Sequence, residues 1–102
     1  MRAWTLGSGS RGNAILLESE DTRVLIDAGY SPRELARRLG ILEIAPESIA
    51  AVVVTHEHVD HARGVAGAQA RWQWHVFGSG GTLDGIPGLD TARCSVVAPG
   101  TS

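Results

Sequence analysis

The sequence has 102 residues and a mass of 10.7 kDa, enough for one small domain and too little for a second catalytic domain. It is 43% hydrophobic and 20% charged, so it can bury a core and is not a disordered tail. Nine basic and eleven acidic residues give a net charge of −2, which excludes an overall positive field for nucleic acid or anionic membranes. Every basic residue is arginine, which excludes lysine Schiff-base and phosphate-loop chemistry.

The N-terminus and the cysteine content predict the cellular location of the protein. Gly7 comes before a long apolar stretch can accumulate, so we expect no secretory signal. The longest apolar run, residues 49–54, is far shorter than the ~20 residues that span a bilayer. The single cysteine, Cys94, cannot form an internal disulfide, which favours a reducing compartment, and it is not predicted to be a nucleophile. We therefore expect a soluble, cytoplasmic protein that does not contact membranes.

Three short strands are predicted at the start of the chain. Residues 3–6, 14–18 and 23–27 are apolar runs of strand length. The glycine- and serine-rich residues 7–13 predict a loop after the first strand. Polar residues 19–22 join the other two strands as a hairpin.

A helix is predicted over residues 32–39. Ser31 is its N-cap, Pro32 takes the first helical position, and Glu34 completes a capping box. Leucines recur at helical spacing, and Gly40 supplies the C-terminal stop. Three arginines are expected on a solvated face without a functional role: Arg33, Arg37 and Arg38.

Residues 49–55 predict a central strand. This nearly continuous β-branched run is typical of a strand that is buried on both faces. Small, helix-tolerant residues fill positions 61–71, which predicts a second helix.

The last third of the chain predicts shorter elements. Residues 72–77 read as a strand on which Trp72, Trp74 and Val76 share one face. A flexible glycine loop over 78–81, a turn capped by Thr82 and a last strand over 94–98 follow. The predicted order of the main elements is three strands, helix, strand, helix and strand.

Histidines cluster directly after the predicted central strand. Residues 55–61 read Thr-His-Glu-His-Val-Asp-His and contain three of the four histidines of the chain. Imidazole and carboxylate groups suit zinc, manganese or iron, and turn formation alone would not require three histidines. We predict that two adjacent metal ions are bound here by four ligands: His56, His58, Asp60 and His61. The His-Glu-x-x-His zinc pattern does not apply, because Asp60 stands where it needs a histidine, so Glu57 is not predicted to be the general base.

This motif resembles the metallo-β-lactamase superfamily, whose signature His-x-His-x-Asp-His follows a strand. The resemblance extends to Gly-Ser-Gly-Ser-Arg-Gly-Asn at residues 7–13 and Leu-Ile-Asp-Ala-Gly at residues 25–29. These motifs are most similar to a bacterial branch of phosphodiesterases and exonucleases, whose best-known members act on double-stranded DNA. The resemblance implies a mixed α/β fold, the N-terminal half of an αββα sandwich, with residues 1–102 as a partial domain that lacks the C-terminal half.

The resemblance also implies roles for the ligands. His56 and His58 would bind the first ion, and Asp60 and His61 the second, with Asp60 also assigned a catalytic role. Zinc is the first expectation, with manganese or iron as alternatives. The implied reaction is hydrolysis of a phosphodiester by a hydroxide bound between two metal ions. The family takes further ligands from later in a longer chain, and His75 comes too early to be one of them.

Other residues are expected to support this site. Asp27 ends an apolar strand, and in the family this acid lies near the metal centre, so it is expected to orient a ligand or the loop. Ser8, Ser10 and Asn13 are candidate phosphate contacts. The glycines of residues 7–12 match a dinucleotide fingerprint, but a short apolar run follows them in place of a helix. They are interpreted as allowing a tight turn at the rim of the metal cleft.

Two functional alternatives remain open. The ligand motif also fits a thioesterase or lactamase of the same superfamily. The loop-like residues 99–102 suggest an interrupted chain, so the protein can also be an inactive fragment or split half. The expected partners are accordingly nucleic acid or another phosphodiester substrate, and a complementary chain or a second copy that binds an exposed sheet face.

Overall fold

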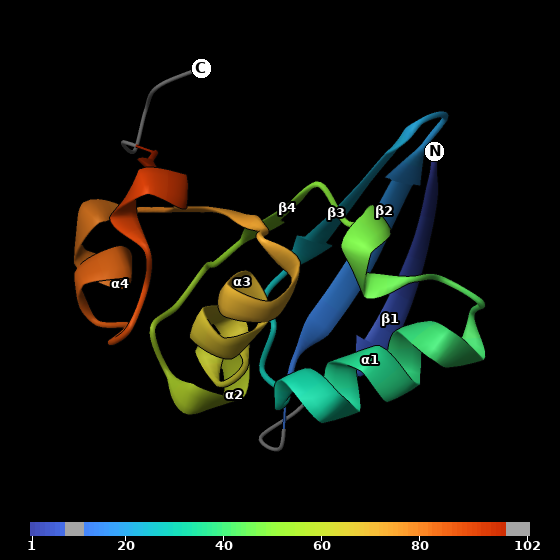
Figure 1. Cartoon of the computed structure of the whole chain (residues 1–102), viewed down its shortest axis with the longest axis horizontal. Helices are drawn as coiled ribbons and strands as arrows, with labels where there is room; N and C mark the ends of the chain where they lie inside the picture. Colours follow the sequence, from blue (N-terminus) through green and yellow to red (C-terminus); the bar gives the residue numbers. More distant parts are fainter. Residues whose placement is uncertain (8–11, 98–102) are drawn as a thin grey trace.

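The computed structural model describes residues 1–7 and 12–97, with Val59 and Asp60 described by their backbone alone. Within these residues, six strands form one mixed sheet (Figure 1). The strands are β1 (Arg2–Gly7), β2 (Ala14–Ser19), β3 (Thr22–Ile26), β4 (Ala51–Val53), β5 (His75–Gly78) and β6 (Cys94–Val96), in the order β1-β2-β3-β4-β5-β6. The pairs β1–β2 and β2–β3 are antiparallel, whereas β3, β4, β5 and β6 run parallel.

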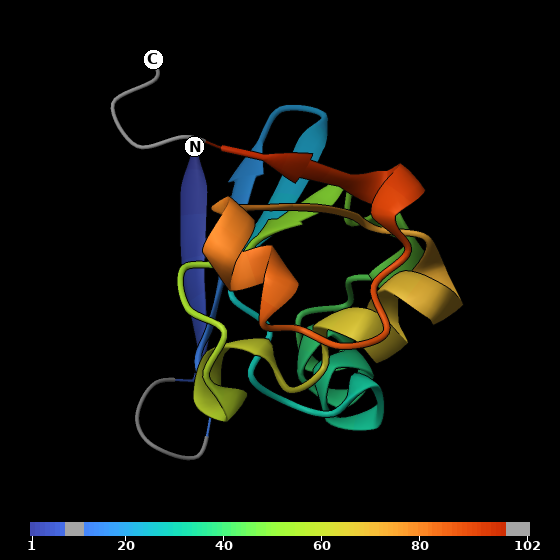
Figure 2. The same cartoon turned by 90° about the vertical axis from the view of Figure 1, so that its left-hand side faces the viewer.

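Helices provide the crossovers between the parallel strands. They are α1 (Pro32–Ile41), α2 (Val59–Ala62), α3 (Val65–Trp72) and α4 (Gly80–Asp84), with short 3-10 turns at Pro46–Ser48 and Thr91–Arg93. Helix α1 links β3 to β4, α2 and α3 link β4 to β5, and α4 links β5 to β6. Figure 2 shows α1 and α3 on one side of the sheet. In the described part of the chain, no helix combines the length and the apolar character needed to cross a membrane.

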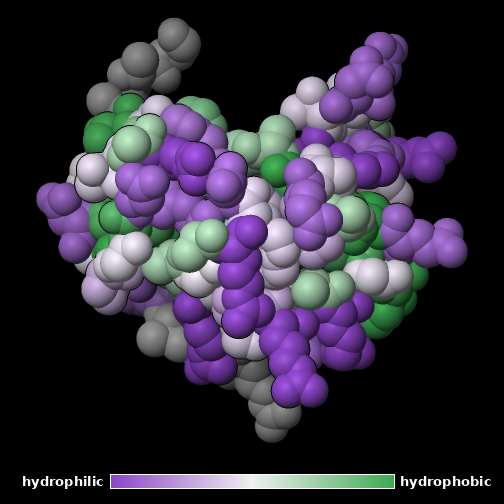
Figure 3. Space-filling view, in the orientation of Figure 1, coloured by the Kyte–Doolittle hydropathy of each residue, from purple (hydrophilic) through white to green (hydrophobic). Residues whose placement is uncertain are grey.

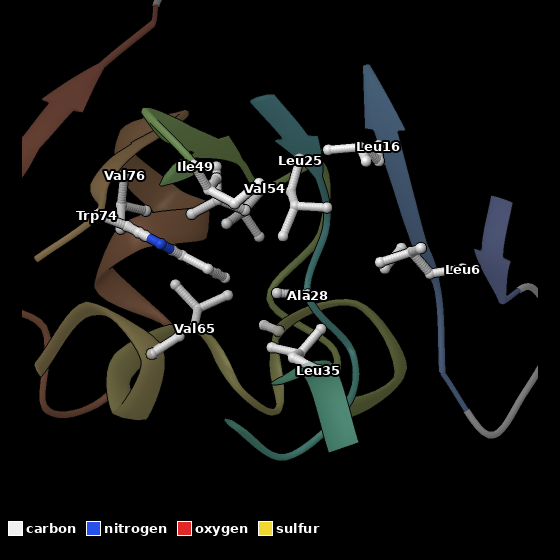
Figure 4. Close-up of a cluster of buried hydrophobic side chains, with 14 of the residues drawn as sticks. Leu6, Leu16, Leu25, Ala28, Leu35, Ile49, Val54, Val65, Trp74 and Val76 are labelled. Carbon is white, nitrogen blue, oxygen red and sulfur yellow. The ribbon is translucent and has the colours of Figure 1, made fainter. Parts of the chain in front are cut away.

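The core lies between this sheet face and the helices. Leu16, Leu25, Val52 and Val76 are paired across four neighbouring strands, so they form one row on one face, and all four are fully buried. Buried leucines of α1 and Val65 of α3 join them in one hydrophobic cluster (Figure 4). This alternation of buried and less buried residues along the strands is what fixes their register.

The opposite sheet face remains partly open. Its paired row of Ile15, Ile26, Val53 and Phe77 is apolar but only partly buried, and Ile15 keeps 39% of its surface exposed. The side seen in Figure 3 carries mainly hydrophilic side chains, with smaller hydrophobic areas between them.

The predicted mixed α/β fold is confirmed: one sheet with helices on one face is half of a four-layer sandwich.

The prediction of a strand over residues 72–77 is wrong at its start. Trp72 is the last residue of α3, and Gln73 ends the helix in a left-handed conformation with φ of 60°. The strand begins only at His75. Trp72 and Trp74 therefore do not share a strand face, although their ring centroids lie 5.2 Å apart. The aromatic content of this segment favours a strand, but packing of the helix against the core prevails.

Other predicted boundaries also shift. The central strand is shorter than residues 49–55 and begins only at Ala51, because the N–H of residue 49 closes the 3-10 turn on Pro46. It is also not fully buried on both faces, since Val53 is only partly buried. The helix predicted over residues 61–71 is divided at Gly64, where a Cβ atom would lie 1.8 Å from the Tyr30 carbonyl oxygen.

Glycines do not form the predicted stop and loop. Gly40 lies inside α1, which ends at Ile41. In place of the loop over residues 78–81, helix α4 begins at Gly80, and its cap is Ser79 rather than Thr82. Residue 98 of the predicted last strand lies outside the described residues.

Trp74 is the largest fully buried side chain, and its Nε1–H donates to the Pro46 carbonyl oxygen over 2.9 Å. We expect Trp74→Phe to lower the free energy of unfolding by about 1–3 kcal/mol, because it removes this hydrogen bond and leaves unfilled volume. The matched variant Trp72→Phe alters a less buried ring and should lower the free energy of unfolding by a smaller amount. Urea unfolding of both variants measures the difference, and equal losses would contradict this assignment.

The N-terminus of α1 is capped as predicted, but only half of the capping box forms. The Ser31 hydroxyl accepts a hydrogen bond from the Glu34 N–H, whereas the Glu34 carboxylate binds Arg37 and Arg38. Hydrogen bonds from Arg37 and then Arg38 lower the pKa of Glu34 from 4.5 to about 2. A lowered pKa stabilises the folded state above the unfolded pKa, and this contribution disappears as the pH falls toward the folded pKa.

We therefore expect Glu34→Gln to reduce the thermal midpoint most above pH 4.5, with the difference from the parent shrinking as the pH falls toward about 2. The effect should be small, because these ion pairs lie at the protein surface, where solvent screens them. Thermal unfolding of both proteins across this pH range tests the prediction, and a difference that does not change with pH would count against it.

Candidate metal centre

The topology brings Asp27 and Thr55 together. Strands β3 and β4 are parallel neighbours with Ile26 opposite Val53, so the residues that follow them lie at the same edge of the sheet. The N–H of Asp27 continues this pairing by donating to the Val53 carbonyl oxygen over 2.8 Å. The loop that leaves β4 therefore starts beside the exit of β3.

The Asp27 carboxylate organises this loop. It is 5% exposed, and its Oδ1 accepts a hydrogen bond from the Thr55 N–H over 2.7 Å. Its Oδ2 accepts from the Thr55 hydroxyl over 2.7 Å and lies 2.7 Å from His61 Nδ1. Asp27 has a left-handed φ of 65°, a conformation that aspartate tolerates better than most residues. A buried carboxylate in this backbone conformation thus contacts both ends of residues 55–61.

Three of the predicted ligands lie close together. The ring centroids of His56 and His61 are 4.7 Å apart, and those of His56 and His58 are 6.1 Å apart. One turn of backbone brings His61 back toward the start of the loop, because its N–H donates to the His58 carbonyl oxygen over 2.9 Å. The sequence forms this turn directly after β4, so the histidines gather at the sheet edge.

Hydrogen bonding assigns the tautomers of two rings. The Thr55 hydroxyl donates to Asp27, so it accepts from His56 Nδ1–H over 3.0 Å. His61 Nδ1–H likewise donates to Asp27. These hydrogen bonds place the lone pair of each ring on Nε2, the nitrogen that could then bind a metal ion.

The other predicted site residues are placed less completely. Asp60 lies in α2, but its side chain lies outside the described part of the structure, as do Ser8 and Ser10. Asn13 is partly buried, and its carbonyl oxygen accepts from the Gly29 N–H over 3.0 Å, beside the exit of β3. Among the side chains that are described, no group of three or more histidine, cysteine, aspartate or glutamate residues is arranged to hold a metal ion.

The chemistry of the described donors fits a divalent metal ion. Neutral imidazoles are common ligands of zinc. Histidines that bind metals usually donate the other ring N–H to a carboxylate or carbonyl group, which is the relationship of His61 to Asp27.

Sequence reasoning missed the role of Thr55 and a cavity beside this loop. Thr55 links Asp27 to His56, and its position directly before the first histidine is the only signal for that role. Glu57 and Arg63 line a cavity of about 350 Å³ between the loop and the segment that follows α4, with Ile86 among its apolar walls. The fold brings two distant segments together at this cavity: a Cβ atom at Gly85 would lie 2.9 Å from the Glu57 side chain, so only glycine fits there.

Comparisons with known proteins show which family the sequence matches. A sequence profile described as Metallo-beta-lactamase superfamily matches residues 7–93. Exodeoxyribonuclease WalJ of Streptococcus pneumoniae serotype 2 is 42% identical over 60 residues, which are 59% of this chain and 22% of that protein. Exodeoxyribonuclease YycJ of Bacillus anthracis is 27% identical over 84 residues, which are 82% of this chain and 32% of that protein.

Solved structures show the same fold. A B3 metallo-beta-lactamase with an active-site glutamic acid superimposes with a TM-score of 0.79 at 21% identity, over 97% of this chain and 44% of that chain. A subclass B3 enzyme from a soil metagenome library gives a TM-score of 0.76 at 25% identity, over 97% and 44% of the two chains. The chain spans less than half of the length of each of these relatives. With its fold, histidine motif and profile match in agreement, the chain belongs to the metallo-beta-lactamase superfamily.

Proposed function

We propose that this chain carries the first metal-binding loop of a metal-dependent hydrolase that cleaves phosphodiester bonds in DNA. The observation that carries the proposal is the buried Asp27 carboxylate, which contacts Thr55 and His61 and so fixes the loop that bears the histidines. The names of the two exodeoxyribonuclease relatives support DNA as the substrate class.

The chain's own residues have separate roles in this proposal. His56 and His58 would hold one ion, and Asp60 and His61 a second, with zinc first and manganese or iron as alternatives. Bound divalent ions would supply positive charge that neutralises the phosphodiester and lowers the pKa of water. Asp27 keeps the Nδ1 proton of His61 in place, and through Thr55 it does the same for His56. Asp60 is proposed to be both ligand and catalytic residue.

Substrate binding is assigned to the glycine-rich segment beside the loop. Asn13, together with Ser8 and Ser10, is proposed to contact a phosphate of the substrate. The net charge of −2 means that such contacts must act locally, since no overall field attracts DNA.

The second candidate is a half-site that needs further ligands from elsewhere. It is favoured by the small share of its relatives that the chain spans. In this proposal residues 1–102 are a partial domain. Either a complementary chain or a second copy would cover the open sheet face and complete the metal site.

Metal titration with parallel activity assays tests both candidates. Zinc or manganese is added to the purified protein, and hydrolysis of duplex DNA, of bis(p-nitrophenyl) phosphate, of a thioester and of a β-lactam is measured. Metal-dependent hydrolysis of DNA supports the first candidate. Metal binding without turnover supports the half-site. Turnover of only the thioester or the β-lactam would overturn the assigned substrate class, and failure to bind metal would overturn both.

A further inference from the structure

We propose that Tyr30 and Arg38 are positioning residues that hold both ends of the glycine-rich segment, Gly7 and Gly12, against the exit of β3. They would thereby set where Asn13 lies relative to the histidine loop. The effect on substrate binding rests on the proposed function, whereas the positioning of the backbone can be tested without it.

The Tyr30 ring fills the space beside both glycines. A Cβ atom at Gly7 would lie 1.6 Å from the Tyr30 hydroxyl oxygen, and one at Gly12 would lie 2.5 Å from ring carbon Cε1. The Tyr30 hydroxyl also donates to the Gly12 carbonyl oxygen over 3.2 Å. One side chain thus touches the last residue of β1 and the approach to β2, and only glycine admits so close a contact.

Arg38 fixes the ring from the side of α1. Its guanidinium carbon lies 4.1 Å from the centroid of the Tyr30 ring, a cation–π distance. The same guanidinium donates to the Leu6 carbonyl oxygen and, through Nε, to the Glu34 carboxylate over 2.7 Å. The expectation that Arg38 belongs to a merely solvated face is therefore wrong. Its side chain is 30% exposed, against 59% for Arg37, which pairs with Glu34.

The β1–β2 ladder is irregular at this end of β1. The pairing of β1 with β2 shifts register between Thr5 and Gly7, so the ladder is irregular where the segment begins. Contacts from Tyr30 and Arg38 add support from outside the sheet at this point.

Residues 28–30 connect this support to the histidines. The Gly29 N–H donates to the Asn13 carbonyl oxygen over 3.0 Å, and the Ala28 N–H donates to the His61 carbonyl oxygen over 2.9 Å. On the other side, the Gly64 backbone packs directly against the Tyr30 carbonyl group. The same short stretch therefore contacts the candidate phosphate-binding residue and the metal loop, so displacement of Tyr30 alters their relative position.

Matched variants on one helix separate this role from general stability. Arg38→Met removes the contacts to Tyr30 and Leu6 together with an ion pair to Glu34. Arg37→Met removes only an ion pair to Glu34, so it is the matched control. Tyr30→Phe removes only the bond to Gly12. With zinc or manganese bound, we expect Arg38→Met to raise the KM for duplex DNA about tenfold and Tyr30→Phe about threefold, with kcat and metal stoichiometry unchanged. Arg37→Met should leave KM unchanged.

A second readout does not depend on catalysis. Amide hydrogen exchange at Gly12 and Asn13, followed by NMR, should be faster in Arg38→Met and Tyr30→Phe than in Arg37→Met. If the parent protein hydrolyses no DNA, the proposed function fails and the exchange rates alone decide the positioning role. Equal exchange in Arg38→Met and Arg37→Met overturns it. In an active protein, equal KM values for Arg38→Met and Arg37→Met also overturn it, as does a fall in kcat at constant KM in Arg38→Met.

Discussion

Replacing Asp27 with asparagine should lower the affinity of the protein for zinc by about ten- to a hundredfold, the usual effect of losing the partner of a metal-bound histidine. The carboxylate accepts the proton of His61 Nδ1, whereas an asparagine amide placed there would donate one. The ring proton would then move to Nε2, the nitrogen that the proposed ion needs.

Asparagine is the informative substitution because it changes the groups that face His61 and the Thr55 hydroxyl and leaves the rest of the residue nearly unchanged. It has nearly the same shape, it tolerates the left-handed φ of 65°, and its oxygen can still accept from the Thr55 N–H. Asp27→Ala would add backbone strain of about 1–2 kcal/mol in this conformation and would leave the Thr55 N–H without its partner. Only the asparagine variant therefore separates metal affinity from folding.

The measurement is zinc affinity by competition with a chromophoric chelator, with circular dichroism as the check on folding. Asp21→Asn is the matched control, since it makes the same chemical change at an exposed residue of the β2–β3 turn. Unchanged zinc affinity in a folded Asp27→Asn variant would contradict the role of Asp27. Equal losses in the two variants would point to overall charge instead.

Local patterns in the sequence predict much of the fold, because they depend on neighbouring residues. The three opening strands and the start of α1 follow from short apolar runs and a cap within a few positions of each other. The end of α3 cannot be predicted in this way, because Gln73 takes a left-handed conformation that sequence propensity assigns to glycine or asparagine. Burial of Trp74 in the core accounts for that turn.

The candidate site is likewise predicted from sequence only in part. The histidines are found from sequence because they lie within six positions of one another. The contact between Asp27 and His61 joins residues 34 positions apart, and it exists only because β3 and β4 are parallel neighbours. Sequence places Asp27 near the site by resemblance alone, and the position of Thr55 directly before His56 is its only sign that Thr55 connects the carboxylate to that ring.

The glycine-rich segment shows how one pattern can have a different physical cause. The sequence suggests that its glycines serve a tight turn. At the two described positions, Gly7 and Gly12, neither has a positive φ, and both are instead crowded by the ring of Tyr30. That requirement comes from a side chain at least 18 positions away, so no local rule reveals it.

Removing His58 should abolish metal-dependent hydrolysis if the histidine cluster is the metal site. Loss of a metal ligand should reduce activity at least as much as loss of a residue that orients a ligand. His58→Ala should therefore reduce the rate by about a hundredfold or more and lower the amount of bound metal. His58 lies in the loop after β4, and its carbonyl oxygen already anchors the turn to His61. Truncation of the side chain keeps that backbone contact, so loss of metal need not follow from loss of the fold.

His75→Ala is the matched control, because it removes the remaining histidine from a different part of the sheet. His75 begins β5 opposite Ala51, packs against Phe77 with ring centroids 4.7 Å apart, and has its Nε2 2.8 Å from the Ser95 hydroxyl oxygen. It thus lies at the start of the parallel strands, whereas the histidine loop follows the end of β4. Metal content and hydrolysis of bis(p-nitrophenyl) phosphate should fall in His58→Ala and stay near the parent value in His75→Ala. If both variants keep their metal, or both lose it equally, the histidine cluster is not the metal site.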